Sequence, residues 1–117
     1  MTNATIYHNP RCSKSRQALK LLQDNHIDPT IVEYLKTPPS KAALKKIITQ
    51  LNISPRDLLR KKESAFAENN LADSTLSDDA IIQAMVDHPI LIERPIVIVD
   101  NNKAAVGRPI ENIQEII

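Results

Sequence analysis

The chain has 117 residues, which suits one domain built on a single core. Hydrophobic residues make up 42% of it and aromatic residues only 3%, so the core must be aliphatic and few rings can stack on single-stranded nucleic acid. The formal net charge is +1, which gives no overall field to attract DNA or an acidic membrane. We therefore expect no nucleic-acid and no membrane partner, and any anion preference must come from a local site.

Cysteine occurs once, at Cys12. The chain can form neither an internal disulfide nor a Cys-x-x-Cys redox pair, and a second sulfur would have to come from another molecule. No set of His, Asp and Glu has convincing metal-ligand spacing, so we expect no metal site and no bound cofactor. The start of the chain lacks a signal-peptide pattern, and no apolar run approaches the roughly 18 residues of a membrane span. The cytoplasm is the expected location.

The first third of the chain predicts a strand–helix–strand unit. Residues 4–7 are short, apolar and β-branched, as in a strand, and the loop 8–11 contains a breaking Asn-Pro pair. Helical spacing of apolar residues then predicts a helix from Ser13 to about Asn25, and residues 31–35 read as a second strand. Such a unit implies that the two strands are parallel.

Residues 40–88 predict a helical block. Ser40 can cap an amphipathic helix whose apolar positions follow at i, i+3, i+4 and i+7, namely Leu44, Ile47, Ile48 and Leu51. Ser54-Pro55 predicts the start of a second helix, and Ser77 the start of a third that stops near His88 because Pro89 follows.

Sheet signals return after this block. Residues 96–99 predict a fully apolar strand, 100–103 a hairpin turn, and 104–106 the return strand. Gly107 marks a sharp exit, and Pro109 opens a last helix that should place Ile110, Ile113 and Ile117 on one side. The order β-α-β, helical insertion, β-β-α predicts an α/β protein of thioredoxin-like fold. We expect a single domain, 1–117, with its core in 1–39 and 89–117 and its insertion at 40–88.

Cys12 is the main candidate for chemistry. It lies immediately before a helix, where unpaired backbone N–H groups and the helix dipole favour negative charge. In such places the pKa of cysteine falls from about 8.5 to about 3.5–7.5, and the thiolate is the nucleophile. Arg11, Lys14 and Arg16 act in the same direction, and His8 could stabilise the thiolate as imidazolium. The helix N-terminus is also a ready anion site, to which Ser13 and Ser15 add hydroxyl donors.

Three arginines occur where they could bind an anion. Arg94 precedes Pro95 at the start of a buried strand, a junction that in thioredoxin-like folds is a cis-proline facing the active-site cysteine. Arg108 closes the final hairpin and Arg60 lies in the helical block. A Cys-x5-Arg phosphatase loop is disfavoured, because that spacing would require arginine at the position of Ala18.

The stretch from Tyr7 to Arg16 resembles the active-site motif of the glutaredoxin-linked arsenate reductase family, the ArsC-like branch of thioredoxin folds. Residues 33–39, 58–63, 88–97 and 106–109 resemble the family's remaining motifs, in the same order. The resemblance implies Cys12 as catalytic nucleophile, with His8 and Ser15 in the catalytic set. It also implies an oxyanion-binding set of three arginines, Arg60, Arg94 and Arg108.

The resemblance further implies that the Cys12 thiolate attacks arsenate, that glutathione as co-substrate attacks the arsenic, and that glutaredoxin resolves the mixed disulfide. Ser13-Lys14 stands where plasmid-borne reductases commonly have Gly-Thr; Lys14 adds positive charge, so we expect Cys12 to stay acidic. Two alternatives stay open. One is an Spx-like regulator, disfavoured because Ser15 stands where its sensor forms have a second cysteine and because the sequence shows no extended tail after Ile117. The other is a thiol reductase acting on another small oxyanion or on mixed disulfides.

Overall fold

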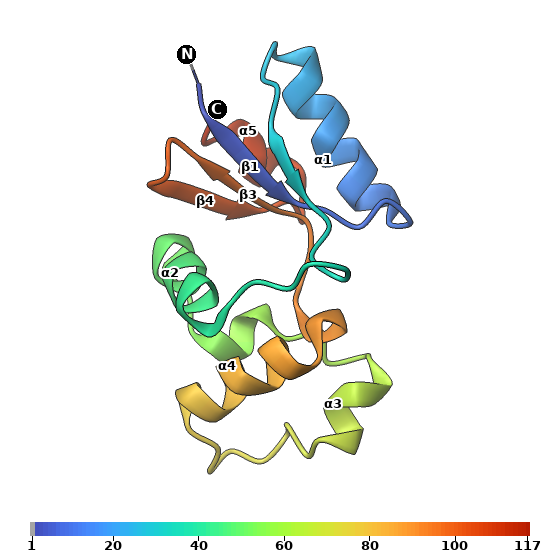
Figure 1. The fold of residues 1–117 in the computed structure, drawn as a ribbon, viewed down its shortest axis with the longest axis vertical. Helices are drawn as coiled ribbons and strands as arrows, with labels where there is room; N and C mark the ends of the chain where they lie inside the picture. Colours follow the sequence, from blue (N-terminus) through green and yellow to red (C-terminus); the bar gives the residue numbers. More distant parts are fainter. Residues whose placement is uncertain (1) are drawn as a thin grey trace. The chain divides into compact units, whose positions relative to one another are not determined.

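The computed structural model describes residues 2–117. They divide into two compact units, one made of the chain up to Thr37 together with Arg94–Ile117, and one made of Pro38–Glu93. Figure 1 shows that the first unit contains the sheet and that the second is built from helices. The assignment of both units to one domain stays a prediction. Within the described residues, no helix is long and apolar enough to cross a membrane.

The sheet has four strands: β1 (Ala4–Tyr7), β2 (Thr30–Val32), β3 (Ile96–Val99) and β4 (Lys103–Val106). Their order is β2-β1-β3-β4, with β1 parallel to β2 and antiparallel to β3, and β3 antiparallel to β4. Tyr7 pairs with Val32 on one side and with Ile96 on the other, and Ile96 pairs with Val106. The ends of β1, β2 and β4 and the start of β3 therefore share one end of the sheet.

Two helices complete this unit, α1 (Ser13–Asp24) and α5 (Glu111–Gln114). Leu22 of α1 and Ile113 of α5 are fully buried and belong to the same core cluster as Ile6 and Val97 of the sheet. The β-α-β and β-β-α segments predicted from the sequence are thus present, and α1 follows directly from β1 through a short loop (Figure 1).

The second strand and the last helix differ from their predictions. β2 ends at Val32 instead of Leu35, because the N–H groups of Lys36 and Thr37 both donate to the Glu33 carbonyl at 2.9 Å and close a turn. Tyr34 is buried within this turn. Helix α5 is a single turn, and Ile117 is 38% exposed and not on a buried side.

The hairpin between β3 and β4 forms where the sequence predicts it. Asp100 and Asn101 adopt φ of 53° and 57°, the left-handed region that short polar residues tolerate. Gly107, which follows β4, does not have a positive φ, so a sharp backbone exit is not what requires glycine there. A Cβ at this position would lie 2.7 Å from Ile113 Cδ1 and 2.8 Å from Pro95 Cγ, so any side chain would force these neighbours to shift.

The helical unit contains α2 (Lys41–Leu51), α3 (Ser64–Glu68) and α4 (Asp78–Asp87), with the 3-10 turns η1 (Pro55–Leu58) and η2 (Pro89–Leu91). Ser40 and Ser77 cap α2 and α4 as predicted, each accepting from the backbone N–H three residues later. The helix predicted to start at Ser54 is only the turn η1, and α3 and η2 are not anticipated by the pattern.

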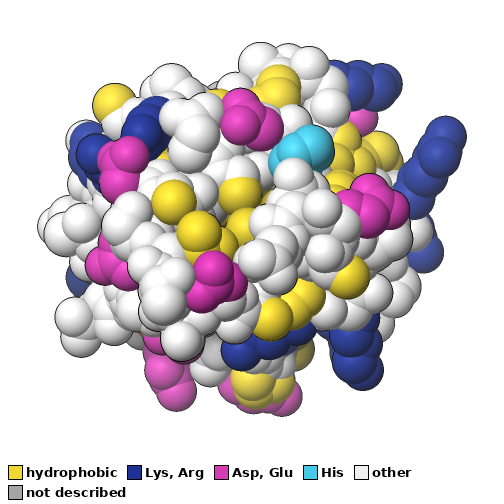
Figure 2. Space-filling model, turned by 90° about the horizontal axis from the view of Figure 1, so that it is seen from below, with side chains coloured by type: hydrophobic (Ala, Val, Ile, Leu, Met, Phe, Trp, Pro, Cys, Tyr) yellow, Lys and Arg dark blue, Asp and Glu magenta, His cyan; other side chains and the backbone are white. Residues whose placement is uncertain are grey.

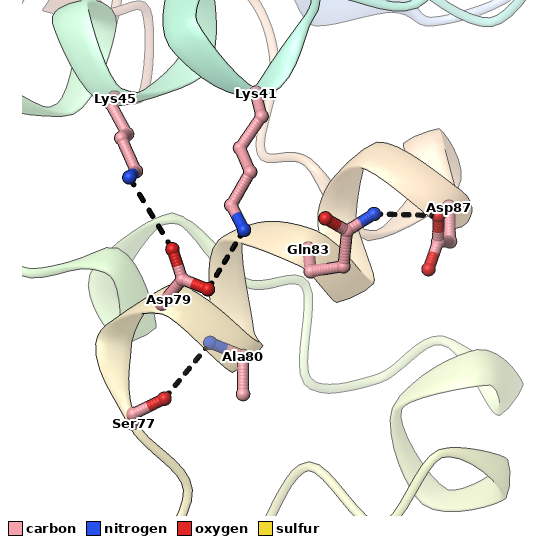
Figure 3. A network of polar contacts seen from close by, with 7 residues as sticks. All are labelled: Lys41, Lys45, Ser77, Asp79, Ala80, Gln83 and Asp87. Atoms are coloured by element: carbon pink, nitrogen blue, oxygen red, sulfur yellow. Dashed lines mark hydrogen bonds and ion pairs between the residues drawn. The ribbon is translucent and has the colours of Figure 1, made fainter.

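Helices α2 and α4 pack through buried aliphatic side chains and a polar bridge. Leu44 and Ile81 are fully buried. At the surface, Asp79 at the start of α4 accepts from Lys41 at 2.8 Å and lies 3.3 Å from Lys45 of α2 (Figure 3). These contacts, led by the Lys41 hydrogen bond, hold the pKa of the Asp79 carboxyl below its ordinary value. On the face shown in Figure 2, acidic and basic side chains are interspersed with hydrophobic ones. This face therefore carries no extended patch of a single charge.

Candidate active site

The shared end of the sheet gathers the predicted functional residues of the first unit. His8 and Cys12 follow β1, Glu33 follows β2, Arg94 precedes β3 and Arg108 follows β4. The Arg94–Pro95 peptide bond is cis, as predicted, and the Arg108–Pro109 bond is cis as well. Because the strand register places these four junctions in one row, side chains from distant parts of the sequence meet around the loop before α1.

Cys12 is the N-cap of α1, with extended backbone angles of φ −93° and ψ 123°, and its side chain is partly exposed. Burial is the largest single influence on the pKa of this thiol and raises it. The backbone N–H groups of Ser15 and Lys14 and the charges of Arg94 and Arg108 act in the opposite direction and together lower the pKa below its ordinary value. Cys12 therefore has the environment of a nucleophilic thiolate.

Arg108 lies close to the sulfur of Cys12. Its Nη2 is 3.5 Å from Cys12 Sγ, and its Nε donates to the Arg94 carbonyl at 2.8 Å. The second contact fixes the guanidinium against the chain that leads into β3, so the position of Arg108 depends on the Arg94–Pro95 junction. The structure thus brings Arg94 and Arg108 near Cys12, while their binding of an oxyanion stays a prediction.

Ser15 and His8 form a buried pair beneath the loop. Ser15 is fully buried and His8 is 6% exposed, and Ser15 Oγ lies 2.8 Å from His8 Nδ1. The same hydroxyl accepts from the Asn9 N–H at 3.0 Å. Since the Ser15 N–H also faces Cys12, this residue links the loop, the histidine and the start of α1.

The structure does not support the prediction that His8 acts on the thiolate as imidazolium. Burial is the main cause that lowers the pKa of His8, with Arg16 acting in the same direction and Glu33 opposing it. The ring is therefore neutral near pH 7, and its direct contact is with Ser15. A positioning role through Ser15 fits this geometry better than a charge role.

Arg60 belongs to the helical unit and is not among the charges that act on the Cys12 thiol. Its side chain pairs with Glu63 at 2.8 Å, and its N–H donates to the Leu91 carbonyl. Its assignment to an oxyanion site stays a prediction.

Two contributors to the site are missed by the sequence analysis, Asn9 and Glu33. The Asn9 N–H reaches Ser15 only because the loop folds back, and Arg16 Nη1 holds that fold by donating to the Pro10 carbonyl at 2.9 Å. Glu33 acts on His8 because β2 ends one residue before it, which no local pattern indicates. Among residues 2–117, no group of three or more His, Cys, Asp or Glu could hold a metal ion.

The fold and the site together define a thiol protein with one acidified cysteine at a helix N-terminus, flanked by arginines. The model of the ArsC family matches residues 7–116, and the chain belongs to this family. It is 48% identical over 118 residues to an arsenate reductase of Neisseria meningitidis, with both chains covered completely. It is 54% identical to the uncharacterized protein YfgD of Escherichia coli, and the match covers 96% of this chain and 94% of that one. An arsenate reductase structure from Vibrio cholerae superposes with a TM-score of 0.95 at 48% identity, covering 99% of this chain and 98% of that one, which confirms the predicted thioredoxin-like fold.

Proposed function

We propose that this protein is an arsenate reductase that uses Cys12 as its nucleophile. The observation that carries the proposal is the acidified Cys12 thiol at the start of α1, with Arg108 Nη2 3.5 Å from the sulfur. A thiolate beside fixed cations suits attack on a tetrahedral oxyanion, because the cations offset the repulsion between two negative groups. The arsenate reductases among the relatives of this chain support the choice of substrate.

The reaction balances with one external thiol. The Cys12 sulfur bonds to arsenic(V) and one arsenate oxygen leaves as water after protonation. The external thiol then attacks the arsenic, and its sulfur and the Cys12 sulfur join in a disulfide. The two electrons that the two sulfurs give up reduce arsenic(V) to arsenic(III), which leaves as arsenite. A second thiol must reduce the mixed disulfide to regenerate Cys12.

Each side chain has a distinct part in this scheme. Arg94 and Arg108 lower the pKa of Cys12, and in our proposal they also bind the arsenate oxygens. His8 and Ser15 position the first turn of α1, whose N–H groups face the sulfur. Charge-assisted donors of this kind are about twice as strong as neutral ones.

The external thiol is glutathione in our proposal, and glutaredoxin resolves the mixed disulfide. The single cysteine supports this scheme, because the chain supplies no second thiol of its own. A reducing compartment such as the cytoplasm, where glutathione keeps thiols reduced, is the setting this chemistry requires.

The test is arsenite formation by the purified protein with arsenate, glutathione, glutaredoxin and a reductase linked to NADPH, beside Cys12→Ser. Turnover that disappears in Cys12→Ser is the expected result. Omission of glutaredoxin should leave a first turnover that stops at the Cys12–glutathione disulfide, detectable as a mass gain on Cys12. If wild-type protein forms no arsenite while Cys12 still titrates as an acidic thiol, arsenate is not the substrate, and sulfate, phosphate and mixed disulfides become the next compounds to test.

A further inference from the structure

A cleft of 270 Å³ lies beside the loop that leads to Cys12. One wall is formed by that loop, residues 8–11, and the other by Glu33, Leu35 and Lys36, which follow β2. The cleft exists because β2 ends early: the turn at Glu33 carries these side chains to the same end of the sheet as the loop after β1. Its volume lies just below the range for sites of drug-sized ligands, about 300–1,000 Å³, and so suits a small ligand.

The lining combines both signs of charge with an apolar wall. Arg11 and Lys36 supply cations, Glu33 supplies a carboxylate, and Pro10 and Leu35 supply apolar surface. Leu35 is 43% exposed, so its apolar surface is open to a ligand in the cleft. Lys36 Nζ lies 3.7 Å from Glu33 Oε1, which is too far for a tight hydrogen-bonded ion pair. Both side chains can therefore turn toward a ligand.

This cleft and the arginine pair lie on different sides of the Cys12 loop. The sheet order places β2 on one side of β1 and β3 with β4 on the other. Glu33 therefore approaches the loop from the β2 side, whereas Arg94 and Arg108 approach it from the β3 and β4 side. A small oxyanion favours the side where Arg94 and Arg108 lie, whereas the cleft holds the Glu33 carboxylate beside its two cations. The cleft suits instead a ligand that carries an amino group and carboxylates together.

We infer that this cleft binds the small thiol co-substrate, a zwitterionic thiol peptide of the glutathione type, with its amino group at Glu33 and its carboxylates at Arg11 and Lys36. The site binds one reactant on each side of Cys12, the oxyanion with the arginines and the thiol peptide in the cleft. The inference rests on the proposed thiol chemistry of Cys12 but not on arsenate as the substrate.

The test uses thiol–disulfide exchange, which needs no arsenate. The Cys12 thiolate attacks one sulfur of an added disulfide, the Cys12 mixed disulfide forms, and the other half leaves as a thiolate. The rate with glutathione disulfide is divided by the rate with bis(carboxymethyl) disulfide, which carries carboxylates but no amino group. This ratio cancels any change in the reactivity of Cys12 itself, including an indirect effect of Glu33 through His8.

In Glu33→Gln we expect the ratio to fall about tenfold, the size of effect for losing one hydrogen bond to a charged group. The matched control Glu115→Gln removes the exposed carboxylate of the C-cap residue of α5. It should leave the ratio at the wild-type value. An equal ratio in wild type and Glu33→Gln would overturn the inference. A change confined to the rate of reduction by glutaredoxin would also overturn it, because the cleft would then be a protein-docking surface. A lowered ratio in a protein that forms no arsenite would instead overturn only the proposed substrate.

Discussion

At the scale of single residues, the site depends on side chains that act through their neighbours. Ser15 is the clearest case, because one buried hydroxyl serves His8 and Asn9 while the backbone of the same residue faces Cys12. The sequence singles out Cys12 by its place before a helix, and the resemblance to the arsenate reductase family adds His8 and Ser15 to the predicted catalytic set. It does not identify Asn9 or Glu33, because their contacts depend on how the loop folds back and where β2 ends.

Replacing Ser15 by alanine should lower the free energy of unfolding by about 1–3 kcal/mol, because the Asn9 N–H and His8 Nδ1 lose a buried partner. Urea denaturation followed by circular dichroism measures the change. Ser13→Ala is the matched control, since Ser13 is exposed on the same helical turn and should change the stability by less than about 0.5 kcal/mol. Equal losses in the two variants would contradict the structural role assigned to the Ser15 hydroxyl.

At the scale of elements, strong local patterns are recovered and short segments are not. β1 and β3 match their predicted bounds, and the capped helices α2 and α4 start where Ser40 and Ser77 indicate. The second strand is misplaced because Glu33–Lys36 form a turn whose buried Tyr34 imitates a strand residue. Five-residue α3 and three-residue η2 are too short to show a helical period.

The packing of β4 against β3 and α5 can be tested at Gly107. We expect Gly107→Ala to cost about 1–3 kcal/mol, since the added methyl would meet Ile113 Cδ1 at 2.7 Å and Pro95 Cγ at 2.8 Å. Displacement of Pro95 should also slow the reaction of Cys12, because Arg94 and Arg108 are fixed at that junction. Thermal unfolding and iodoacetamide reactivity measure the two effects, with Asn102→Ala in the exposed hairpin turn as control. Wild-type stability in Gly107→Ala would show that close packing does not select glycine here.

The helical unit offers a second test at this scale. Ser40→Ala and Ser77→Ala each remove a side-chain cap and should lower the free energy of unfolding by about 1 kcal/mol. Threonine at either position keeps the hydroxyl and should restore most of the loss. Chemical denaturation provides the measurement, and alanine variants as stable as the threonine variants would show that the caps contribute nothing.

At the scale of the whole molecule, stability should depend on pH through His8. Burial lowers the pKa of His8 in the folded state below the ordinary value of about 6.5, so the unfolded chain binds the proton more readily. The contribution of neutral His8 is complete above that ordinary value and is lost as the pH falls through the lower folded-state pKa. Asp73 and Asp79 also have lowered pKa values, but their contributions are lost only in more acidic solution.

We therefore expect the free energy of unfolding to decrease as the pH falls from about 7 to about 5, and to decrease less steeply in His8→Gln. Urea denaturation across this range measures both curves. Parallel curves for the two proteins would mean that His8 is not the titrating group.

The nucleophilic role of Cys12 depends on the pKa of its thiol, which can be measured directly. The rate of alkylation by iodoacetamide, followed by mass spectrometry as a function of pH, reports the thiolate fraction at this single cysteine. The structure predicts that the inflection of the wild type lies below the ordinary cysteine pKa. In Arg108→Ala, which lacks the guanidinium 3.5 Å from the sulfur, the inflection should lie at a higher pH than in the control Lys20→Ala. An inflection at the ordinary value in the wild type, unmoved in Arg108→Ala, would contradict the account of Cys12 as an arginine-flanked nucleophile.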